Sequence, residues 1–250
     1  MRYVFAIALL GACRLGFEAV NPIADGEEVD ARAYADVILA DTPIAYFRFE
    51  ETSGTIAIDS SASNLVGMFK AASVLGVPGL VPNEPSSRAL ELAAAPKASN
   101  FVEVANTPVL EPAAGVTIEA WVRPRSVSFH PIVTLGESYQ FFVNNDGRLY
   151  SWINLIGPVT TTSPVVAVGT THHVAMTFDN STVTLYADGV IAGQQAITAS
   201  FGYTHTDFLA IGGDFTANSG PSLDGFIDEV VIYGSALRPD QILAHMTAGR

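Results

Sequence analysis

The feature that most constrains the fold of this chain is a series of short segments in which apolar and polar residues alternate. The clearest is Val116-Thr-Ile-Glu-Ala-Trp-Val-Arg123, whose four aliphatic residues fall on every second position. A period of two places successive side chains on opposite faces of a β-strand. Such segments recur about every 8–12 residues, separated by turn-forming residues, which is typical of antiparallel sandwiches. We therefore predict an all-β fold, a two-sheet antiparallel β-sandwich.

Other stretches with this pattern define the expected strands. We expect them at 44–50, 88–92, 101–104, 131–135, 139–143, 148–153, 173–178, 182–187, 190–197, 208–212 and 225–233. Residues 71–87, rich in Ala, Pro and Ser, are predicted to form a long surface loop. One short C-terminal helix is expected where Pro239 suits the first helical position and Asp240 favours the positive helix start.

The N-terminus has the features of an export signal. Arg2 precedes an apolar run at 4–10, which is far too short to span a membrane and is typical of a signal-peptide core. Leu10-Gly-Ala-Cys13 resembles the lipobox of bacterial lipoproteins, in which the cysteine is lipidated. We interpret 1–13 as a lipoprotein signal peptide with Cys13 as the lipidation site. The alternative is an ordinary secretion signal with an incidental cysteine.

Acidic residues dominate the next segment, so we interpret 14–39 as an acidic tether and 40–250 as one folded domain. The expected location is the bacterial cell envelope, at the outer membrane or cell surface, with contact to the membrane through the lipid anchor only. A protein whose lipobox is not used would be secreted.

The net charge is −13 and the basic residues are scattered singly. Because phosphate binding needs clustered positive charge, nucleic acid is excluded as a partner.

Several segments, in order along the chain, resemble the laminin-G-like jelly-roll family of bacterial secreted proteins, which has the concanavalin A-like lectin/glucanase fold. They are Ala45-Tyr-Phe-Arg-Phe-Glu-Glu-Thr-Ser-Gly54, the loop at 57–67, Val116–Pro124, the hairpin at 172–189 and Phe226–Ile242. Two departures are that Ala62 and Ser63 alter the usual glycine spacing of the loop, and that Thr171 stands where the family usually has Trp. The resemblance implies a concanavalin A-like jelly roll over about 40–249.

Two acidic residues near opposite ends of the domain suggest a shared cation. Alternation places Asp228 on the same face as Phe226, Val230 and Ile232, and Glu51 on the face of Phe47 and Phe49. A carboxylate that points into a core costs several kcal/mol unless it is paired or coordinated. Calcium suits such a site because it takes six to eight oxygen ligands.

The resemblance implies a structural calcium between the opening segment, the 59–64 loop and the closing strand. Carried over to this chain, the ligands are Glu51, Asp59, Asn64 and Asp228, with Glu50 as a substitute for its neighbour. The alternative is that these carboxylates cap turns or accept backbone hydrogen bonds without any metal.

Catalysis has little support in the sequence. Related glucanases carry a Glu-x-Asp-x-x-Glu strand, which points its carboxylates into one cleft, whereas Glu119 stands alone here. Asp228 and Glu229 are adjacent and are expected on opposite faces. The adjacent His172 and His173 cannot converge on one zinc ion from a regular strand, and no nucleophile elbow is present. We therefore predict that the protein is not an enzyme.

Aromatic side chains in strands and loops are the candidates for ligand binding, because their faces stack on sugar rings. The residues chosen are Tyr139, Tyr150, Trp152 and Tyr203. The first functional hypothesis is a non-catalytic domain that binds a carbohydrate. The alternative is an adhesion or structural envelope domain that binds a cell-surface protein, and a hydrolase with an unfamiliar site is the third.

Overall fold

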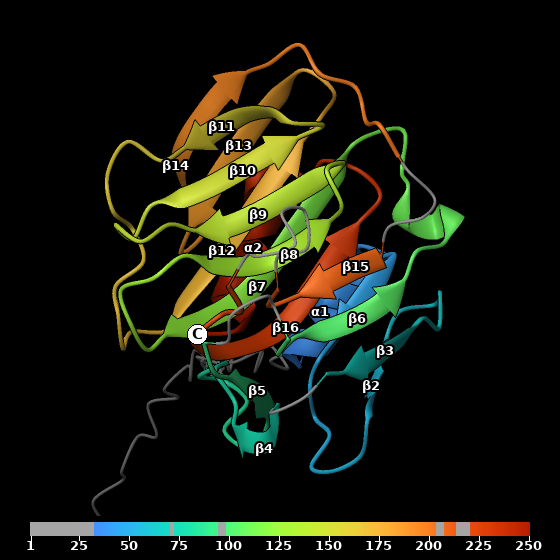
Figure 1. Ribbon diagram of the computed structural model, residues 1–250, viewed down its shortest axis with the longest axis vertical. Helices are drawn as coiled ribbons and strands as arrows, with labels where there is room; N and C mark the ends of the chain where they lie inside the picture. The colour runs from blue at the N-terminus through green and yellow to red at the C-terminus, as the bar shows by residue number, and fades with distance from the viewer. Residues whose placement is uncertain (1–32, 71–72, 95–98, 204–207, 214–220) are drawn as a thin grey trace, which may run out of the picture. The chain divides into compact units, whose positions relative to one another are not determined.

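The computed structural model describes residues 33–70, 73–94, 99–203, 208–213 and 221–250. Two antiparallel sheets of eight strands each lie face to face, as Figure 1 shows, which confirms the predicted sandwich. Cys13, the rest of the predicted signal peptide and most of the predicted tether lie outside the described residues. No helix in the described part of the chain has the length and hydropathy to cross a membrane.

The first sheet has the order β14-β13-β12-β7-β16-β5-β4, and β1 also pairs with β16. Its strands are β1 (Ala45–Phe47), β4 (Val74–Pro78), β5 (Arg88–Leu92), β7 (Val116–Pro124), β12 (His172–Phe178), β13 (Thr182–Ala187), β14 (Val190–Ala196) and β16 (Gly225–Tyr233). The two ends of the domain meet here, since Ala45–Phe47 pairs with Val230–Ile232.

The second sheet, which lies in front of the first in Figure 1, has the order β11-β10-β9-β8-β15-β6-β3-β2. Its strands are β2 (Ile56–Ile58), β3 (Val66–Phe69), β6 (Val102–Ala105), β8 (His130–Leu135), β9 (Tyr139–Val143), β10 (Leu149–Ile153), β11 (Ile156–Thr160) and β15 (Phe208–Ile211).

Four strands were not expected from the sequence pattern: β2, β3, β4 and β11. They lie at or next to the sheet edges. Strand β4 corrects the prediction of a loop over 71–87. Its register with β5 shifts between Val74 and Val77, so its side chains do not follow a regular alternation. At such an edge, backbone pairing to the neighbouring strand decides the structure more than the alternation of side chains.

The main core fills the space between the sheets with aliphatic and aromatic side chains from both, among them Phe47, Phe141 and Phe178. Removal of this apolar surface from water is the main stabilising term of the fold. A short 3₁₀ helix, η1 (Pro108–Leu110), contributes Leu110 to the same core.

A second apolar cluster covers the outer face of the first sheet, where two helices pack. They are α1 (Tyr34–Ala40) and α2 (Pro239–Ala248), the second being the predicted C-terminal helix. Tyr34 and Ile38 of α1 are fully buried in this cluster with Trp121 of β7. Residues 34–39, assigned above to the tether, therefore belong to the folded domain, because their apolar side covers the sheet.

Candidate functional site

The closing strand β16 contains a bulge that changes the face on which its acidic residues lie. The register with β7 shifts between Asp228 and Val231, and Glu229 has a positive φ of 50°. Val230 and Ile232 consequently point into the main core, whereas Asp228 lies on the outer face of the first sheet. This corrects the expectation that Asp228 shares a face with Val230 and Ile232. A bulge adds one residue to the alternation, so side chains on its two sides change faces.

Both carboxylates of the bulge point outward, so the expectation that Asp228 and Glu229 lie on opposite faces is also corrected. Both residues are fully buried. One Asp228 oxygen accepts a hydrogen bond of 2.8 Å from the Leu80 N–H, and the other has no partner within the described part of the chain. Burial, followed by the charge of Glu229, raises the pKa of Asp228 well above its usual value.

The predicted ligand Asp59 is held by hydrogen bonds from its own neighbourhood. Its Oδ1 accepts from the backbone N–H groups of Tyr46 and Ser61, both at 2.8 Å. Its Oδ2 accepts from the Ser61 hydroxyl at 2.8 Å and the Leu65 N–H at 2.9 Å. A carboxylate has about four acceptor sites, so these contacts use its capacity. Asp59 therefore orders the loop between β2 and β3.

The other predicted calcium ligands do not gather around Asp59. A Glu51 oxygen accepts from the Ile58 N–H at 2.7 Å, and the Asn64 amide donates to the Ala62 carbonyl at 3.0 Å. Among the described residues, the one group of three or more acidic side chains with oxygens within 4.8 Å of one another is Glu50, Glu84 and Glu229. Glu51, Asp59 and Asp228 do not form such a group, so calcium binding by them and Asn64 stays a prediction, and we derive no role for a metal from it.

A guanidinium group lies among those three carboxylates. Arg48 Nε donates to Glu229 at 3.1 Å, and Arg48 Nη2 donates to Glu84 at 2.6 Å and lies 3.6 Å from Glu50. The Tyr46 hydroxyl donates to the second oxygen of Glu229. Burial raises the pKa of Glu229 to about 7, against the opposing effects of Arg48 and Tyr46. We call Arg48, Glu50, Glu84 and Glu229 the Arg48 cluster.

A second polar network lies under the helices. Glu119 of β7 accepts from His173 Nε2 and from His245 Nδ1, both at 3.0 Å, and His245 Nε2 donates to Asp41 at 3.0 Å. Because both ring nitrogens of His245 face carboxylates, the ring is a cation that donates twice. Burial alone lowers the pKa of His245, but its hydrogen bonds to Glu119 and Asp41 raise it overall.

These four residues, the Glu119 network, join α1, α2, β7 and β12. Glu119 and His173 are fully buried and His245 is nearly so, which leaves no room for a substrate. The network therefore holds the helices on the sheet. His172 is also hydrogen-bonded, to Asp188 at 2.9 Å, so the two adjacent histidines have separate partners.

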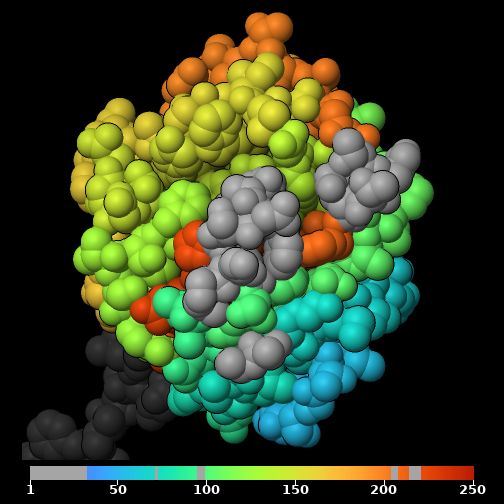
Figure 2. Space-filling view, in the orientation of Figure 1, coloured from blue at the N-terminus to red at the C-terminus, as the bar shows by residue number. Residues whose placement is uncertain are grey.

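The four aromatic candidates lie apart from one another. Tyr139 is fully buried and donates to the Leu110 carbonyl at 3.1 Å, which corrects its assignment to a ligand site: its ring fills the core. Tyr203 donates to the Pro112 carbonyl at 2.7 Å and packs against the core. Tyr150 and Trp152 of β10 are half-buried on the outer face of the second sheet, with ring centroids 6.2 Å apart. That face, with β10 in yellow, is turned to the viewer in Figure 2.

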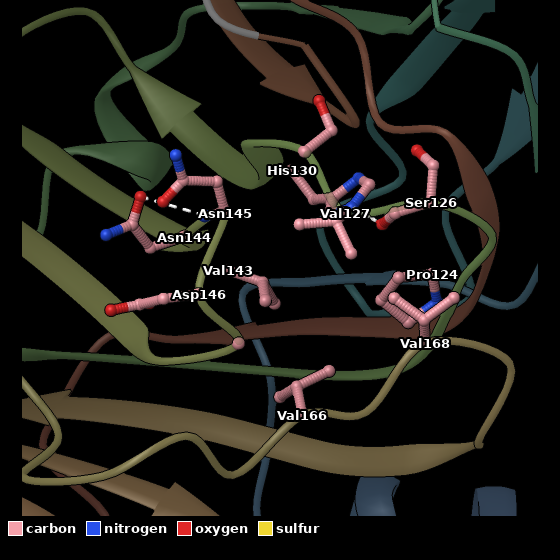
Figure 3. Close-up of a pocket in the computed structure, with 12 residues that line it drawn as sticks. Pro124, Ser126, Val127, His130, Val143, Asn144, Asn145, Asp146, Val166 and Val168 are labelled. Carbon is pink, nitrogen blue, oxygen red and sulfur yellow. Dashed lines mark hydrogen bonds between the residues drawn. The ribbon is translucent and has the colours of Figure 1, made fainter.

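A pocket of about 290 Å³ opens at one end of the sandwich, and we call it the loop pocket. Three connections form it: β7–β8, β9–β10 and β11–β12. In Figure 3, Asn144, Asn145 and Asp146 lie on one side, and Ser126 and His130 on the other. The full lining is Pro124, Ser126, Val127, Ser128, His130, Val143, Asn144, Asn145, Asp146, Gly147, Val166 and Val168. Apolar walls with a few polar groups are typical of small-ligand sites.

Hydrogen-bonding groups in the loop pocket are free to meet a ligand. No hydrogen bond in the described part of the chain uses the side chains of Ser126, Ser128 or Asn145. His130 Nε2 donates to the Ser126 carbonyl at 2.9 Å, and its Nδ1 accepts from the Asp224 N–H at 3.2 Å, so the ring is neutral. Burial lowers the pKa of His130, which agrees with this state.

The comparison with protein families agrees with this architecture. A family model described as the concanavalin A-like lectin/glucanases superfamily matches residues 96–243, more than half of the chain. The chain belongs to this laminin-G-like family. The match includes the connections that form the loop pocket and all of β16, and it begins after the Arg48 segment. No curated protein sequence matches the chain.

Solved structures with the same fold include toxin domains and a domain of an arabinanase. The receptor-binding domain of botulinum neurotoxin C/D mosaic serotype has a TM-score of 0.63 at 12% identity, over 83% of this chain and 51% of its own. Domain 4 of AbnA, a GH43 extracellular arabinanase from Geobacillus stearothermophilus, in complex with arabinotriose, has a TM-score of 0.63 at 16% identity, over 82% and 98%.

A third is the ligand-binding domain of botulinum neurotoxin serotype D in complex with N-acetylneuraminic acid, with a TM-score of 0.62 at 13% identity, over 86% and 52%. This laminin-G-like chain spans about half the length of the neurotoxin domains and nearly all of the arabinanase domain. At these identities the likeness shows a shared fold.

Sequence reasoning missed the loop pocket and the Arg48 cluster. The signal for the pocket was Asn144-Asn-Asp-Gly147, a run of turn residues between two strands. Such a run marks a loop, but the other two walls come from distant connections. Arg48 lies between Phe47 and Phe49, which face the core, so alternation predicts that Arg48 points outward. The sequence does not predict its partners, because Glu84 and Glu229 come from other parts of the chain.

Proposed function

We propose that this chain is a non-catalytic carbohydrate-binding domain of a bacterial cell-envelope lipoprotein, and that the loop pocket binds the sugar. The observation that carries the proposal is a pocket with apolar walls and unpaired hydroxyl and amide groups in a lectin-like fold. Sugar rings present apolar faces and hydroxyl groups together, so they match such a surface. The arabinotriose and N-acetylneuraminic acid complexes of the structural neighbours support this class of ligand.

The charged residues in and around the loop pocket favour neutral glycans over acidic ones as ligands. Among the lining residues, Asp146 is the one acidic residue, and the set contains no Lys or Arg. Asp146 lies 3.4 Å from Arg148, which offsets its charge. The nearby Arg125 is already paired with Glu91 and Asp224. A sugar carboxylate would therefore find no free cation in the loop pocket, and binding an unpaired charge away from water is unfavourable.

Replacement of Asn145 by alanine tests the site. We expect Asn145→Ala to weaken binding of neutral oligosaccharides by about 1 kcal/mol, roughly fivefold in Kd, because one hydrogen bond is lost. The measurement is a glycan array followed by calorimetric titration of the best ligand. Gln195→Ala on β14, which removes an exposed amide far along the chain from the pocket, is the matched control. Equal affinity in the two variants, or binding of acidic glycans alone, would contradict the proposal.

The envelope location rests on the lipobox-like segment ending at Cys13. Export would bring the domain to glycans outside the cytoplasm, and the lipid would hold it at a membrane. The test is metabolic labelling of the full chain with a fatty-acid analogue. We expect label in the wild type and none in Cys13→Ser, whereas label retained in the variant would exclude this anchor.

One observation favours the second candidate function, a protein-binding adhesion or structural domain. Strands β2 and β3 expose four large apolar side chains at the edge of the second sheet: Ile56, Ile58, Val66 and Met68, which are 49–63% exposed. Contiguous apolar surface at a sheet edge is typical of interaction sites. Capture of one cell-surface protein, unaffected by free sugars and lost in Ile58→Lys, would establish this function in place of sugar binding.

A further inference from the structure

Three carboxylates meet at the junction of the first and last strands of the domain. The upstream half of β16 pairs with β5 and its downstream half pairs with β1, on either side of the bulge. The bulge brings buried Glu229 to Glu50, which follows β1, and Glu84, which precedes β5. Three carboxylates within 4.8 Å of one another repel unless a cation lies among them.

Arg48 already supplies that cation. Its guanidinium contacts carboxylates from three separate segments: Glu229 at 3.1 Å, Glu84 at 2.6 Å and Glu50 at 3.6 Å. The side chain of Arg48 is 26% exposed and that of Glu229 is not exposed at all. A planar guanidinium with five donors can serve several carboxylates at once, which a single ammonium group cannot do.

One of the residues expected to bind calcium, Asp59, has no acceptor site to spare. Both oxygens of Asp59 accept hydrogen bonds from the chain itself, and the Asn64 amide N–H donates within its own loop. Glu51 Oε2 and Asp228 Oδ1 have no partner among the described residues. Calcium bound to Asp59 would have to displace the contacts of that carboxylate. We infer that Arg48 takes the place of the structural calcium, so that the junction of the first and last strands is held by a side chain and the fold is independent of calcium.

The test compares the full chain in calcium chloride and in EDTA. We expect the wild-type protein to have the same Tm in both and calorimetry to detect no calcium binding. Arg48→Met, which keeps the approximate length of the side chain but removes its charge, should lower Tm by roughly 5 °C, because the buried Glu229 and the partly buried Glu84 lose their counter-ion. Arg48→Lys should lie between the two, since it keeps the charge but loses the fork geometry.

Arg125→Met is the matched control, because Arg125 also joins two carboxylates but is 43% exposed. We expect this control to change Tm by about 2 °C or less. The inference is overturned if EDTA lowers the Tm of the wild type and calcium restores it, or if Arg48→Met is no less stable than Arg125→Met. If Arg48→Met does not fold, the inference is tested by the Tm of the wild type in EDTA and by the Tm of Arg48→Lys. Sugar binding at the loop pocket is measured separately, so its outcome does not affect this result.

Discussion

Replacement of Glu119 by alanine is expected to destabilise the domain by about 3–5 kcal/mol, the cost of breaking a buried ion pair by removing one partner. Glu119 is fully buried and accepts hydrogen bonds from His173 and His245. Although burial alone raises the pKa of Glu119, these two hydrogen bonds hold it below its usual value. Without the carboxylate, the His245 cation keeps Asp41 as its one acidic partner, and both helices lose an attachment to the sheet.

The measurement is the free energy of unfolding from urea titrations of the full chain. Glu119→Gln should lose less than Glu119→Ala, because an amide oxygen still accepts one hydrogen bond. Glu103→Ala is the control, since Glu103 also lies on a strand but forms a half-exposed pair with Lys70, worth at most about 1 kcal/mol. A loss in Glu119→Ala no greater than in Glu103→Ala would show that the network adds little.

Alternation predicted the central strands well, because each has one face in the core. Strand β7, for example, was expected at 116–123 and runs from Val116 to Pro124. Strand β2 was missed: both Ile56 and Ile58 face solvent, and the intervening Ala57 points inward. An edge strand with apolar residues on its exposed face reverses the usual pattern, so alternation does not predict it.

At the Arg48 cluster, the alternation of residues failed as a guide for a different reason. Alternation predicts a regular strand through positions 228 and 229, and the bulge that turns both carboxylates outward has no signature in the residues themselves. It is a property of the pairing, since β5 and β1 share one edge of β16. The partners of Glu229 were beyond prediction as well, because the Tyr46 and Arg48 contacts span about three quarters of the chain.

The two buried carboxylates Glu229 and Glu119 have opposite dependences on pH. Burial raises the pKa of Glu229 from 4.5 to about 7, so the folded state retains a proton that the unfolded state has lost between these values. Stability should therefore fall as pH rises through this interval, by on the order of 3 kcal/mol in total. The lowered pKa of Glu119 acts below this range: its contribution is complete above 4.5 and is lost as pH falls through the folded-state pKa.

The free energy of unfolding, measured between pH 4.5 and about 7, is expected to be greatest at the acidic end and to decline towards neutrality. In Glu229→Gln the decline should become shallower, because an amide does not titrate and still accepts from Arg48. It should not vanish, since the raised pKa of Asp228 acts in the same direction. Glu103→Gln, which removes a half-exposed carboxylate, should leave the slope as in the wild type. Stability that rises with pH across this interval, or an unchanged slope in Glu229→Gln, would show that Glu229 is ionised throughout and that the guanidinium of Arg48 outweighs its burial.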